Sequence, residues 1–457
     1  MQNRTIAAIS TPYGRGAISL IRITGEGAFA ICESVFKPKS GKALSECRHA
    51  SAVYGDIIFE NEIIDDGIAT VFKAPNSYTG EDTVEIACHG GILVTKTVLD
   101  ALLSAGAYPA EAGEFTKRAY ANGKLRLSEA EAIMDIIDAR TPSALKLANA
   151  SGRGRLSDEA EKIYSRIKTL LASIYAYIDY PDEDLTDVTV DEMKNELKAL
   201  RDVTARLERS YKTGKAVRQG VKVAICGKPN VGKSSVLNMF TGEDTAIVTD
   251  IEGTTRDVIK TQAVCGDILL DLSDTAGIRQ TSDTVESIGV ERAVEEIKKA
   301  ELILAVFDTS RALDTLDRDI LKTLENETTV KIALFNKTDK ECLLDTEEVK
   351  KHFEHFVCIS AETKDGKDEL DSLINRLFTD GAIDYGTPYI SNARQYSEVC
   401  KCKSGLESAL SALENGLTQD MASFDLEDAL SAISRLDGRE MTDDVVNEIF
   451  SKFCVGK

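Results

Sequence analysis

A strand that runs directly into a glycine-rich loop constrains the fold of this chain more than any other feature. The β-branched run Val221–Cys226 reads as a strand, residues 227–234 read Gly-Lys-Pro-Asn-Val-Gly-Lys-Ser, and Ser235–Phe240 reads as a helix. This order matches the pattern G-x-x-x-x-G-K-S, in which backbone amides close around phosphates and the helix start adds its positive end. The loop therefore predicts a phosphate-binding site beside the first strand of a parallel α/β sheet.

The elements that follow this loop predict a complete nucleotide site. Lys233 is expected to reach the β and γ phosphates, and the Ser234 hydroxyl is expected to bind Mg²⁺. Gly253–Asp257 and Asp274–Gly277 come next. Asp274 ends a predicted strand, where its carboxylate can hold Mg²⁺ through water, and the last residue of that element can offer its amide to the γ-phosphate.

The element Asn336–Asp339, of the form N-K-x-D, predicts which base is bound. Asp339 can accept hydrogen bonds from N1–H and from the amino group of guanine, whereas adenine would leave the carboxylate unpaired. Ser360 and Ala361 follow a predicted strand at the position where small GTPases close over the base. The predicted GTP-binding residues are Asn230, Val231, Gly232, Lys233, Ser234, Ser235, Thr249, Asp250, Ile251, Glu252, Gly253, Thr254, Thr255, Asp274, Thr275, Ala276, Gly277, Asn336, Lys337, Thr338, Asp339, Ser360 and Ala361.

The residues expected to hydrolyse GTP are less clear from the motifs. Ile278 follows Gly277 at the point where Ras-like proteins carry a glutamine that orients the attacking water. Asn230 and the oxygen-rich segment Thr249–Thr254 instead indicate a monovalent cation that takes the role of an arginine finger. The alternative, that Asn230 only shapes the loop, has equal weight at this point.

The rest of the chain predicts two further domains. Residues 1–118 read as an α+β domain, with short strands such as 17–23 and 83–88 and a helix over 92–103. Residues 119–217 and 383–457 read as helical and flank the α/β domain of residues 218–382. Helices must bury one face, so the simplest prediction is one discontinuous α-helical domain into which a Ras-like α/β P-loop domain is inserted.

One helix start is predicted from a local motif. Ser128-x-x-Glu131 has the form of a capping box, in which the two side chains satisfy backbone amides at the first turn. The acidic run Pro181–Asp184 is interpreted as a solvated loop between helices rather than a metal site, because no further ligands stand at a fixed spacing.

Composition restricts the partners and the location of the chain. The charge of −21, from 55 basic and 76 acidic residues, makes it a poor general nucleic-acid binder. Contact with RNA is therefore expected to be local, for example through Lys117–Arg126, or to depend on a more basic partner. Apolar runs are far shorter than the roughly 20 residues that span a bilayer, and no secretory signal precedes them, so a cytoplasmic location without membrane contact is expected. The ten cysteines are spread singly and are expected to be reduced.

Four further motifs indicate a resemblance to a known family. They are Thr11–Gly16, Pro75–Asp82, Gly113–Ala119 and Phe453–Lys457. Together with the inserted G domain, they resemble the bacterial tRNA modification GTPases of the MnmE (TrmE) family over the whole chain. The C-x-G-K ending combined with an inserted G domain separates this family from other bacterial GTPases, such as those that act in ribosome assembly.

The resemblance implies a potassium-activated GTPase that forms a homodimer through its N-terminal domain. With the FAD-dependent partner MnmG, the family adds an aminomethyl or carboxymethylaminomethyl group to C5 of the tRNA wobble uridine, position 34. By position, the implied catalytic glutamate is Glu286, the Mg²⁺ ligands are Ser234 and Thr255, and the K⁺ ligands are Asn230, Thr249, Ile251 through its backbone, and Thr254. Without the resemblance, Glu286 reads as an exposed charge at a helix start.

The N-terminal domain resembles the tetrahydrofolate-binding fold of the family, in which 5-formyl- or methylene-tetrahydrofolate supplies the one-carbon unit. The implied binding residues are Arg22, Glu85, Lys124 and Lys457. By themselves, Arg22 and Glu85 read as ordinary strand-surface charges. Cys454 is the second candidate catalytic residue, because the nearby Lys457 favours a thiolate that would act on the uridine ring. A packed cysteine beside Phe450 and Phe453 is the equal alternative.

Two other functions stay open from the sequence. One is a GTP-regulated ribosome-assembly factor or scaffold without one-carbon chemistry. The other is a protein that binds GTP and folate while all of the uridine chemistry takes place in the partner.

Overall fold

The structure is a computed structural model of the chain and describes residues 4–179, 189–242, 246–247, 261–274, 295–379, 381 and 383–457. The chain divides into two compact units. The first unit comprises Met1–Met134, Gly152–Val188 and Asn415–Lys457, and the second comprises Asp135–Ser151 and Thr189–Glu414. Each unit has hydrophobic clusters of its own.

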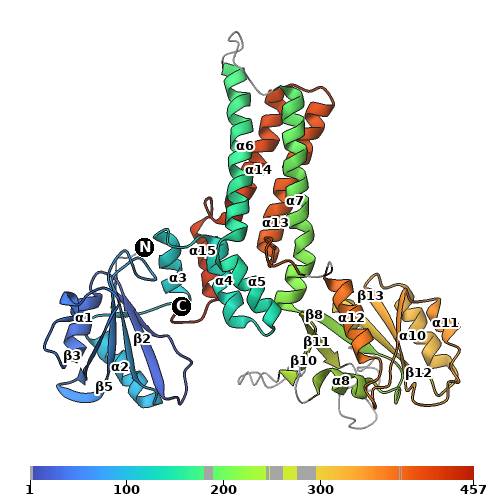
Figure 1. Cartoon of the computed structure of the whole chain (residues 1–457), viewed down its shortest axis with the longest axis horizontal. Coiled ribbons are helices and arrows are strands. Elements are labelled where there is room, and N and C mark those ends of the chain that lie inside the picture. The colour runs from blue at the N-terminus through green and yellow to red at the C-terminus, as the bar shows by residue number, and fades with distance from the viewer. Residues whose placement is uncertain are drawn as a thin grey trace. The chain divides into compact units, whose positions relative to one another are not determined.

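The first unit begins with a mixed sheet in the order β3-β4-β5-β6-β2-β1-β7 (Figure 1). Neighbouring strands are antiparallel except for β1 and β7. The strands are β1 (Ile6–Ile9), β2 (Ile18–Thr24), β3 (Phe36–Pro38), β4 (Ser51–Phe59), β5 (Glu62–Phe72), β6 (Thr83–His89) and β7 (Tyr108–Pro109). The predicted strands over 17–23 and 83–88 are confirmed to within a residue, whereas the short β1, β3 and β7 were not predicted.

One face of this sheet is covered by helices. The opposite face, called the open face, is exposed at Tyr54 of β4 and Ile68 of β5 but buried at Thr24 and Thr83. Helices α1 (Ala28–Val35) and α2 (Ile92–Ser104) pack on the covered face, where Ile21 and Ile86 are fully buried. Because side chains alternate along a strand, the intervening residues lie on the opposite, open face. The predicted helix over 92–103 is confirmed as α2, which ends one residue later.

Residues that pair across neighbouring strands form two rows on the open face. Tyr54 pairs with Ile68, Ile68 with Ala87, and Ala87 with Leu20, which gives an apolar row across β4, β5, β6 and β2. Tyr54 is 52% exposed and Ile68 is 45% exposed. The adjacent row contains Arg22 opposite Glu85.

Helices make up the rest of the first unit. α6 and α14 pack together, with Ile167 of α6 and Ile433 of α14 both buried. Phe450 of α15 packs in a hydrophobic cluster with Leu127 at the start of α4. The helices are α3 (Glu114–Ala121), α4 (Leu127–Asp138, which continues into the second unit), α6 (Arg155–Asp179), α14 (Gln419–Asp437) and α15 (Asp443–Ser451).

The capping box predicted at Ser128 and Glu131 is wrong. Helix α4 already begins at Leu127, so Ser128 lies in its first turn and its hydroxyl bonds the hydroxyl of Ser157 at 2.6 Å. The backbone amide of Arg126 is instead satisfied by the Glu129 carboxylate at 2.9 Å. The helix starts earlier because the Glu129 carboxylate accepts the backbone amide that precedes the helix, while the Ser128 hydroxyl is bonded to a neighbouring helix.

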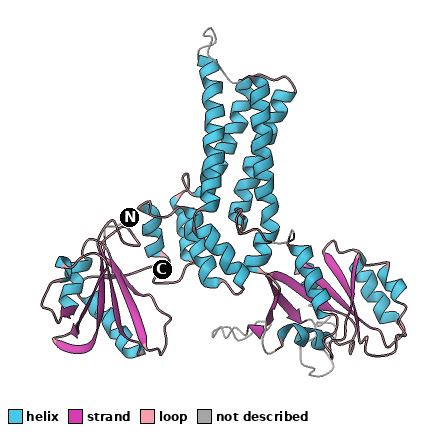
Figure 2. Cartoon of the chain, in the orientation of Figure 1, coloured by secondary structure: helices cyan, strands magenta, loops and turns pink. Residues whose placement is uncertain are grey.

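The second unit contains the α/β sheet predicted from the glycine-rich loop, in the order β14-β13-β12-β8-β11-β10-β9. Its strands are magenta in Figure 2. The five strands from β14 to β11 are parallel, and β10 and β9 continue the sheet in antiparallel fashion. The strands are β8 (Val221–Cys226), β9 (Ala246–Ile247), β10 (Thr261–Cys265), β11 (Ile268–Asp274), β12 (Leu302–Asp308), β13 (Val330–Asn336) and β14 (His355–Cys358). Every residue of β12 is buried, as expected for a central parallel strand.

Helices of this unit either belong to the α/β domain or flank it. α7 ends at Gln219, Gly220 follows with φ +80°, and β8 starts at Val221, so the long helix leads directly into the sheet. The chain leaves the domain after α12 and forms α13, which packs against α7. The helices are α5 (Pro142–Gly152), α7 (Val190–Gln219), α8 (Lys233–Thr241), α10 (Thr315–Glu325), α11 (Thr346–Lys350), α12 (Lys367–Phe378) and α13 (Ala393–Glu414).

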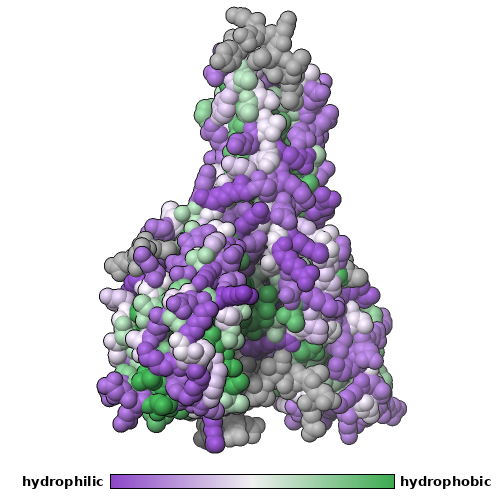
Figure 3. Space-filling view, turned by 60° about the vertical axis from the view of Figure 1, so that its left-hand side comes forward, coloured by the Kyte–Doolittle hydropathy of each residue, from purple (hydrophilic) through white to green (hydrophobic). Residues whose placement is uncertain are grey.

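Hydrophilic residues cover most of the face seen in Figure 3, and hydrophobic residues show as separate patches. Among the described residues, no helix has both the length and the apolar character needed to cross a membrane.

Candidate functional site

The phosphate loop joins β8 to α8 through backbone shapes that only glycine adopts easily. Gly227 has φ +148°, and a Cβ there would come within 2.6 Å of the Val306 carbonyl oxygen. Gly232 has φ +101°, and a Cβ there would overlap the side-chain amide of Asn336. The glycines of the motif are therefore required by both φ and close approach.

Lys233, the lysine of the motif, is held inside the loop. Its Nζ donates to the carbonyl oxygens of Gly227 at 2.8 Å and of Lys228 at 2.9 Å. Ser234 and Ser235 are exposed in the first turn of α8, and Asn230 is exposed with φ +65°. An exposed hydroxyl at a helix start suits a Mg²⁺ ligand that also touches a phosphate.

The N-K-x-D element is fastened to the phosphate loop. Asn336 is buried, donates through Nδ2 to the carbonyl of Val231 at 2.8 Å and accepts the Ala361 amide at 3.0 Å. Lys337 donates to the carbonyl of Asn230 at 3.0 Å and to the Asp308 carboxylate at 2.6 Å. The base-reading and phosphate-binding elements thus share direct bonds.

Asp308 was missed by sequence reasoning, because nothing in a Phe-Asp-Thr-Ser run marks a buried partner for a lysine. Burial alone would raise the pKa of Asp308, but hydrogen bonds from Lys337 and Ser310 lower it overall. The carboxylate therefore stays charged and fixes the Lys337 ammonium.

Asp339, the predicted guanine-reading residue, is exposed at the edge of the site. Its Oδ1 accepts the Ser360 hydroxyl at 2.7 Å, and this bond is the main reason that the pKa of Asp339 is lowered. The Thr338 amide bonds the Ile359 carbonyl at 3.3 Å, which joins the two base-side elements. A carboxylate that stays ionised can accept two donors from guanine.

Other predicted nucleotide residues lie outside the described residues. They are Thr249, Asp250, Ile251, Glu252, Gly253, Thr254, Thr255, Thr275, Ala276, Gly277 and Glu286, and the acidic run at 181–184 also lies outside. The backbone of Asp274 is described and pairs with Ile225, so this residue stands at the carboxyl end of the strand beside β8.

A second cluster lies on the open face of the first unit's sheet. The Arg22 guanidinium contacts the Glu85 carboxylate at 2.7 and 2.8 Å and lies over the rings of Tyr78 and Phe115, at 5.3 and 5.6 Å from their centres. The Arg22 side chain is only 14% exposed. The Arg22 guanidinium is therefore a planar cation that is largely shielded from water. Such a group can recognise a flat polar ring or a carboxylate.

The C-terminal tail contacts this cluster. The carbonyl of Gly456 accepts the Ser10 hydroxyl at 3.1 Å and an Arg22 nitrogen at 3.5 Å, and the carbonyl of Lys457 accepts the Phe115 amide at 3.2 Å. Three of the four implied folate residues, Arg22, Glu85 and Lys457, are thereby brought together.

Lys124 and Cys454 have different surroundings. Lys124 donates to the carbonyl of Pro75 at 2.9 Å, so it is attached to the Pro75–Asp82 motif, which also supplies the Tyr78 ring beside Arg22. Cys454 is exposed, whereas Phe450 and Phe453 are buried beside it. A packed core cysteine therefore does not describe Cys454.

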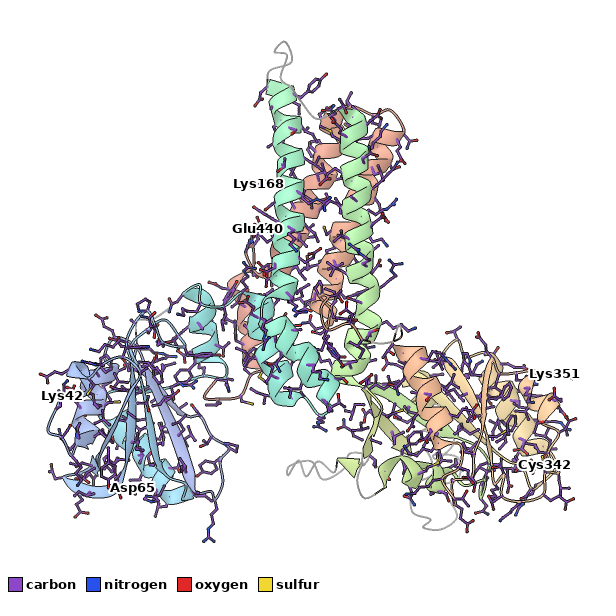
Figure 4. The ribbon with its side chains drawn as sticks, in the orientation of Figure 1. Lys42, Asp65, Lys168, Cys342, Lys351 and Glu440 are labelled. Carbon is purple, nitrogen blue, oxygen red and sulfur yellow. The ribbon has the colours of Figure 1, made fainter. Side chains whose placement is uncertain are left out.

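His89 and Asp65, which is labelled in Figure 4, form an ion pair that gives a pH prediction. Asp65 lies 2.7 Å from His89 Nδ1, and this bond is the main cause of a raised pKa for His89. We expect NMR titration to place the His89 pKa above the ordinary value of about 6.5, and Asp65→Asn to bring it back. The pair stabilises the fold below that ordinary value and loses its effect as the pH rises through the folded-state pKa. Identical His89 titration in both proteins would contradict the prediction.

With its phosphate loop and its base-reading element carried on one sheet, the fold defines a P-loop GTPase whose G domain interrupts a run of helices. The protein-family model described as MnmE helical domain matches residues 127–454 of this chain. The family model described as GTP-binding protein TrmE N-terminus matches residues 5–124. The chain belongs to the MnmE (TrmE) family of tRNA modification GTPases.

Individual relatives are similar over their whole length. Proteins called tRNA modification GTPase MnmE from Clostridioides difficile and Pseudothermotoga lettingae are 40% and 41% identical, each over 99% of this chain and 99% of the relative. The relative of the same name from Streptococcus thermophilus is 40% identical over 99% of this chain and 98% of its own length. A solved structure of Aquifex aeolicus Era bound to GDP·AlF4⁻ is 26% identical over 40% of this chain and 66% of that chain, with a TM-score of 0.28.

Proposed function

We propose that this chain is a potassium-activated GTPase that modifies tRNA together with an FAD-dependent partner, MnmG. The product is an aminomethyl or carboxymethylaminomethyl group on C5 of the wobble uridine, with 5-formyl- or methylene-tetrahydrofolate as the one-carbon donor. The full-length similarity to proteins called tRNA modification GTPase MnmE is the observation that carries this proposal.

The nucleotide part of the proposal is supported by the geometry of the described loop. The Lys233 ammonium is held within the loop by the Gly227 carbonyl, and Ser234 is exposed at the helix start. Lys233 is proposed to meet the β and γ phosphates there, and Ser234 to bind Mg²⁺. A K⁺ ion beside the loop would supply positive charge to the transition state, with the Asn230 side chain as one ligand. Glu286 is proposed to position the attacking water, because Ile278 cannot.

The one-carbon part is supported by the cluster on the open sheet face. Arg22 can bind a folate carboxylate through two nitrogens, and Glu85 can accept hydrogen bonds from pterin N–H groups. Bound tetrahydrofolate would supply the one-carbon unit. Lys124 and Lys457 are proposed to contact the folate carboxylates, and Cys454, being exposed, is proposed to act on the uridine.

The surface of the first unit and the charge of the chain support the proposed partners. The apolar row Tyr54, Ile68, Ala87 and Leu20 lies exposed or half-buried on the open face, and a second copy of this chain is proposed to cover it in a homodimer. The charge of −21 opposes independent tRNA binding, so MnmG is proposed to supply part of the phosphate contacts in the cytoplasm.

GTP turnover in potassium and in sodium buffer tests the cation. We expect at least about a tenfold higher rate in potassium at equal ionic strength, because the cation stabilises transition-state charge. Asn230→Ala is expected to lose this difference while still binding GDP. Equal, slow turnover in both salts would reject the cation mechanism.

Binding of 5-formyltetrahydrofolate and mass analysis of tRNA wobble uridines test the remainder. The native chain is expected to bind the folate and, with MnmG, to restore the modification in cells that lack this gene, whereas Arg22→Ala is expected to do neither. If folate binding fails and Arg22→Ala leaves the modification intact, a scaffold GTPase without one-carbon chemistry is favoured. Full modification with Cys454→Ser would assign the uridine chemistry to the partner.

A further inference from the structure

Lys228, the second residue of the phosphate loop, is buried although no role in nucleotide contact is predicted for it. Its side chain is only 8% exposed, and its Nζ lies 2.8 Å from the Asp314 carboxylate and 2.6 Å from the Asp317 carboxylate. The Asp317 side chain is itself 3% exposed. A buried charge of this kind is tolerated only when it is paired and hydrogen-bonded, so the loop is tied to these two aspartates.

The two aspartates are fixed by the start of α10, independently of the lysine. Asp314 accepts the amide of Asp317 at 3.1 Å, and Asp317 accepts the amide of Asp314 at 3.2 Å, which is a complete capping box. Burial alone would lower the pKa of Lys228, but hydrogen bonds to both carboxylates raise it. The Lys228 ammonium therefore stays charged and is held by two carboxylates that the helix start fixes in place.

The backbone of Lys228 connects these two aspartates to Lys233. Its carbonyl oxygen accepts Lys233 Nζ at 2.9 Å, next to the Gly227 carbonyl at 2.8 Å. On the other side of the loop, Lys337 and Asn336 hold the carbonyls of Asn230 and Val231. The phosphate loop is thus clamped between α10 and the base-reading element, and Lys228 provides the α10 side.

We infer that Lys228 is a positioning residue for GTP binding. Its ion pair with Asp317 fixes the position of the carbonyls of residues 227 and 228. These carbonyls in turn orient the Lys233 ammonium toward the β and γ phosphates. This inference rests on the proposed contact between Lys233 and those phosphates. It predicts that loss of this ion pair weakens binding of the phosphate chain and leaves recognition of the base unchanged, because Asp339 and Ser360 do not contact the pair.

Nucleotide affinities of the full chain in Mg²⁺ buffer test the inference. In Lys228→Met, GTP and GDP are expected to bind about tenfold to a hundredfold more weakly, the usual effect of losing a hydrogen-bonded charge partner. GMP, which lacks the β and γ phosphates, is expected to change less than about twofold, and Lys228→Arg, which keeps the charge, is expected to restore GTP binding. Because Lys228→Met leaves Asp317 buried without its partner, the double variant with Asp317→Asn serves where the single variant fails to fold.

The control and the contrary outcomes separate this inference from a purely structural role. Lys367→Met removes a similar ion pair within α12, at 2.6 Å from Asp371, and is expected to leave all three affinities unchanged. Equal losses for GTP and GMP in Lys228→Met, or additive effects of Lys228→Met and Asp317→Asn on GDP affinity, would overturn the positioning role. If the native chain itself failed to bind GTP more tightly than GMP, the proposed Lys233 contact would fail instead.

Discussion

Replacing Asp339 with asparagine is expected to weaken GTP and GDP binding by about a hundredfold and to create affinity for xanthosine nucleotides. The native carboxylate is proposed to accept from both N1–H and the amino group of guanine, and the Ser360 bond lowers its pKa and so favours the ionised form. A carboxamide offers one acceptor and one donor. That set matches xanthine, which has N1–H beside a carbonyl oxygen, and mismatches guanine.

Affinities for GDP and xanthosine diphosphate measured on the same preparations check this exchange. Asp319→Asn removes an equal charge from an exposed position on α10 and is expected to leave both affinities at their native values. A loss of GDP binding without any gain for the xanthine nucleotide would mean that Asp339 supports the loop rather than reads the base.

Gly456→Ala is expected to release the C-terminal tail from the sheet and to weaken 5-formyltetrahydrofolate binding by about tenfold or more, since hydrogen bonds to charged groups are lost. Gly456 has φ +92°, and a Cβ there would overlap the carbonyl oxygen of Ile9. The backbone of β1 cannot move away, because it is paired with β2 and β7. The bonds from Ser10 and Arg22 to the Gly456 carbonyl would therefore break.

Hydrogen exchange of residues 453–457 and folate titration measure the release of the tail directly. Gly416→Ala is a matched control, because Gly416 also has positive φ, +76°, yet a Cβ there meets nothing within 4 Å. It carries the same left-handed strain of about 1–2 kcal/mol without the collision. GTP affinity is expected to stay unchanged in both variants. Native folate affinity in Gly456→Ala together with a deprotected tail would show that the tail is not part of the folate site.

The nucleotide site was predictable because its elements are short and local. The order strand, glycine loop, helix in residues 221–240 predicts both the parallel sheet and the place of Lys233, since the loop geometry depends on glycines a few residues apart. The same kind of local reasoning failed at Ser128, because the adjacent Glu129 accepts the amide at the helix start and the Ser128 hydroxyl bonds a distant serine, Ser157.

The cluster around Arg22 could be proposed as a folate site only by resemblance, because its parts come from distant segments. Arg22 and Glu85 are 63 positions apart, and Gly456 is 434 positions from Arg22. A charge on a strand looks the same in sequence whether it faces solvent or a docked tail. The decisive fact is that α1 and α2 cover only one face of the sheet, and a period-two pattern cannot say which face stays open.

By itself, the sequence determined the class of nucleotide, the α/β domain and the helical character of the flanking segments, because these depend on spacing within a few turns or strands. The tertiary structure decided which side chains support those elements. Lys228 lies 89 positions from Asp317, and Asp308 lies 29 positions from Lys337. Buried ion pairs of this kind form only when strands and helices pack, since desolvation and precise distance, rather than local spacing, set their strength.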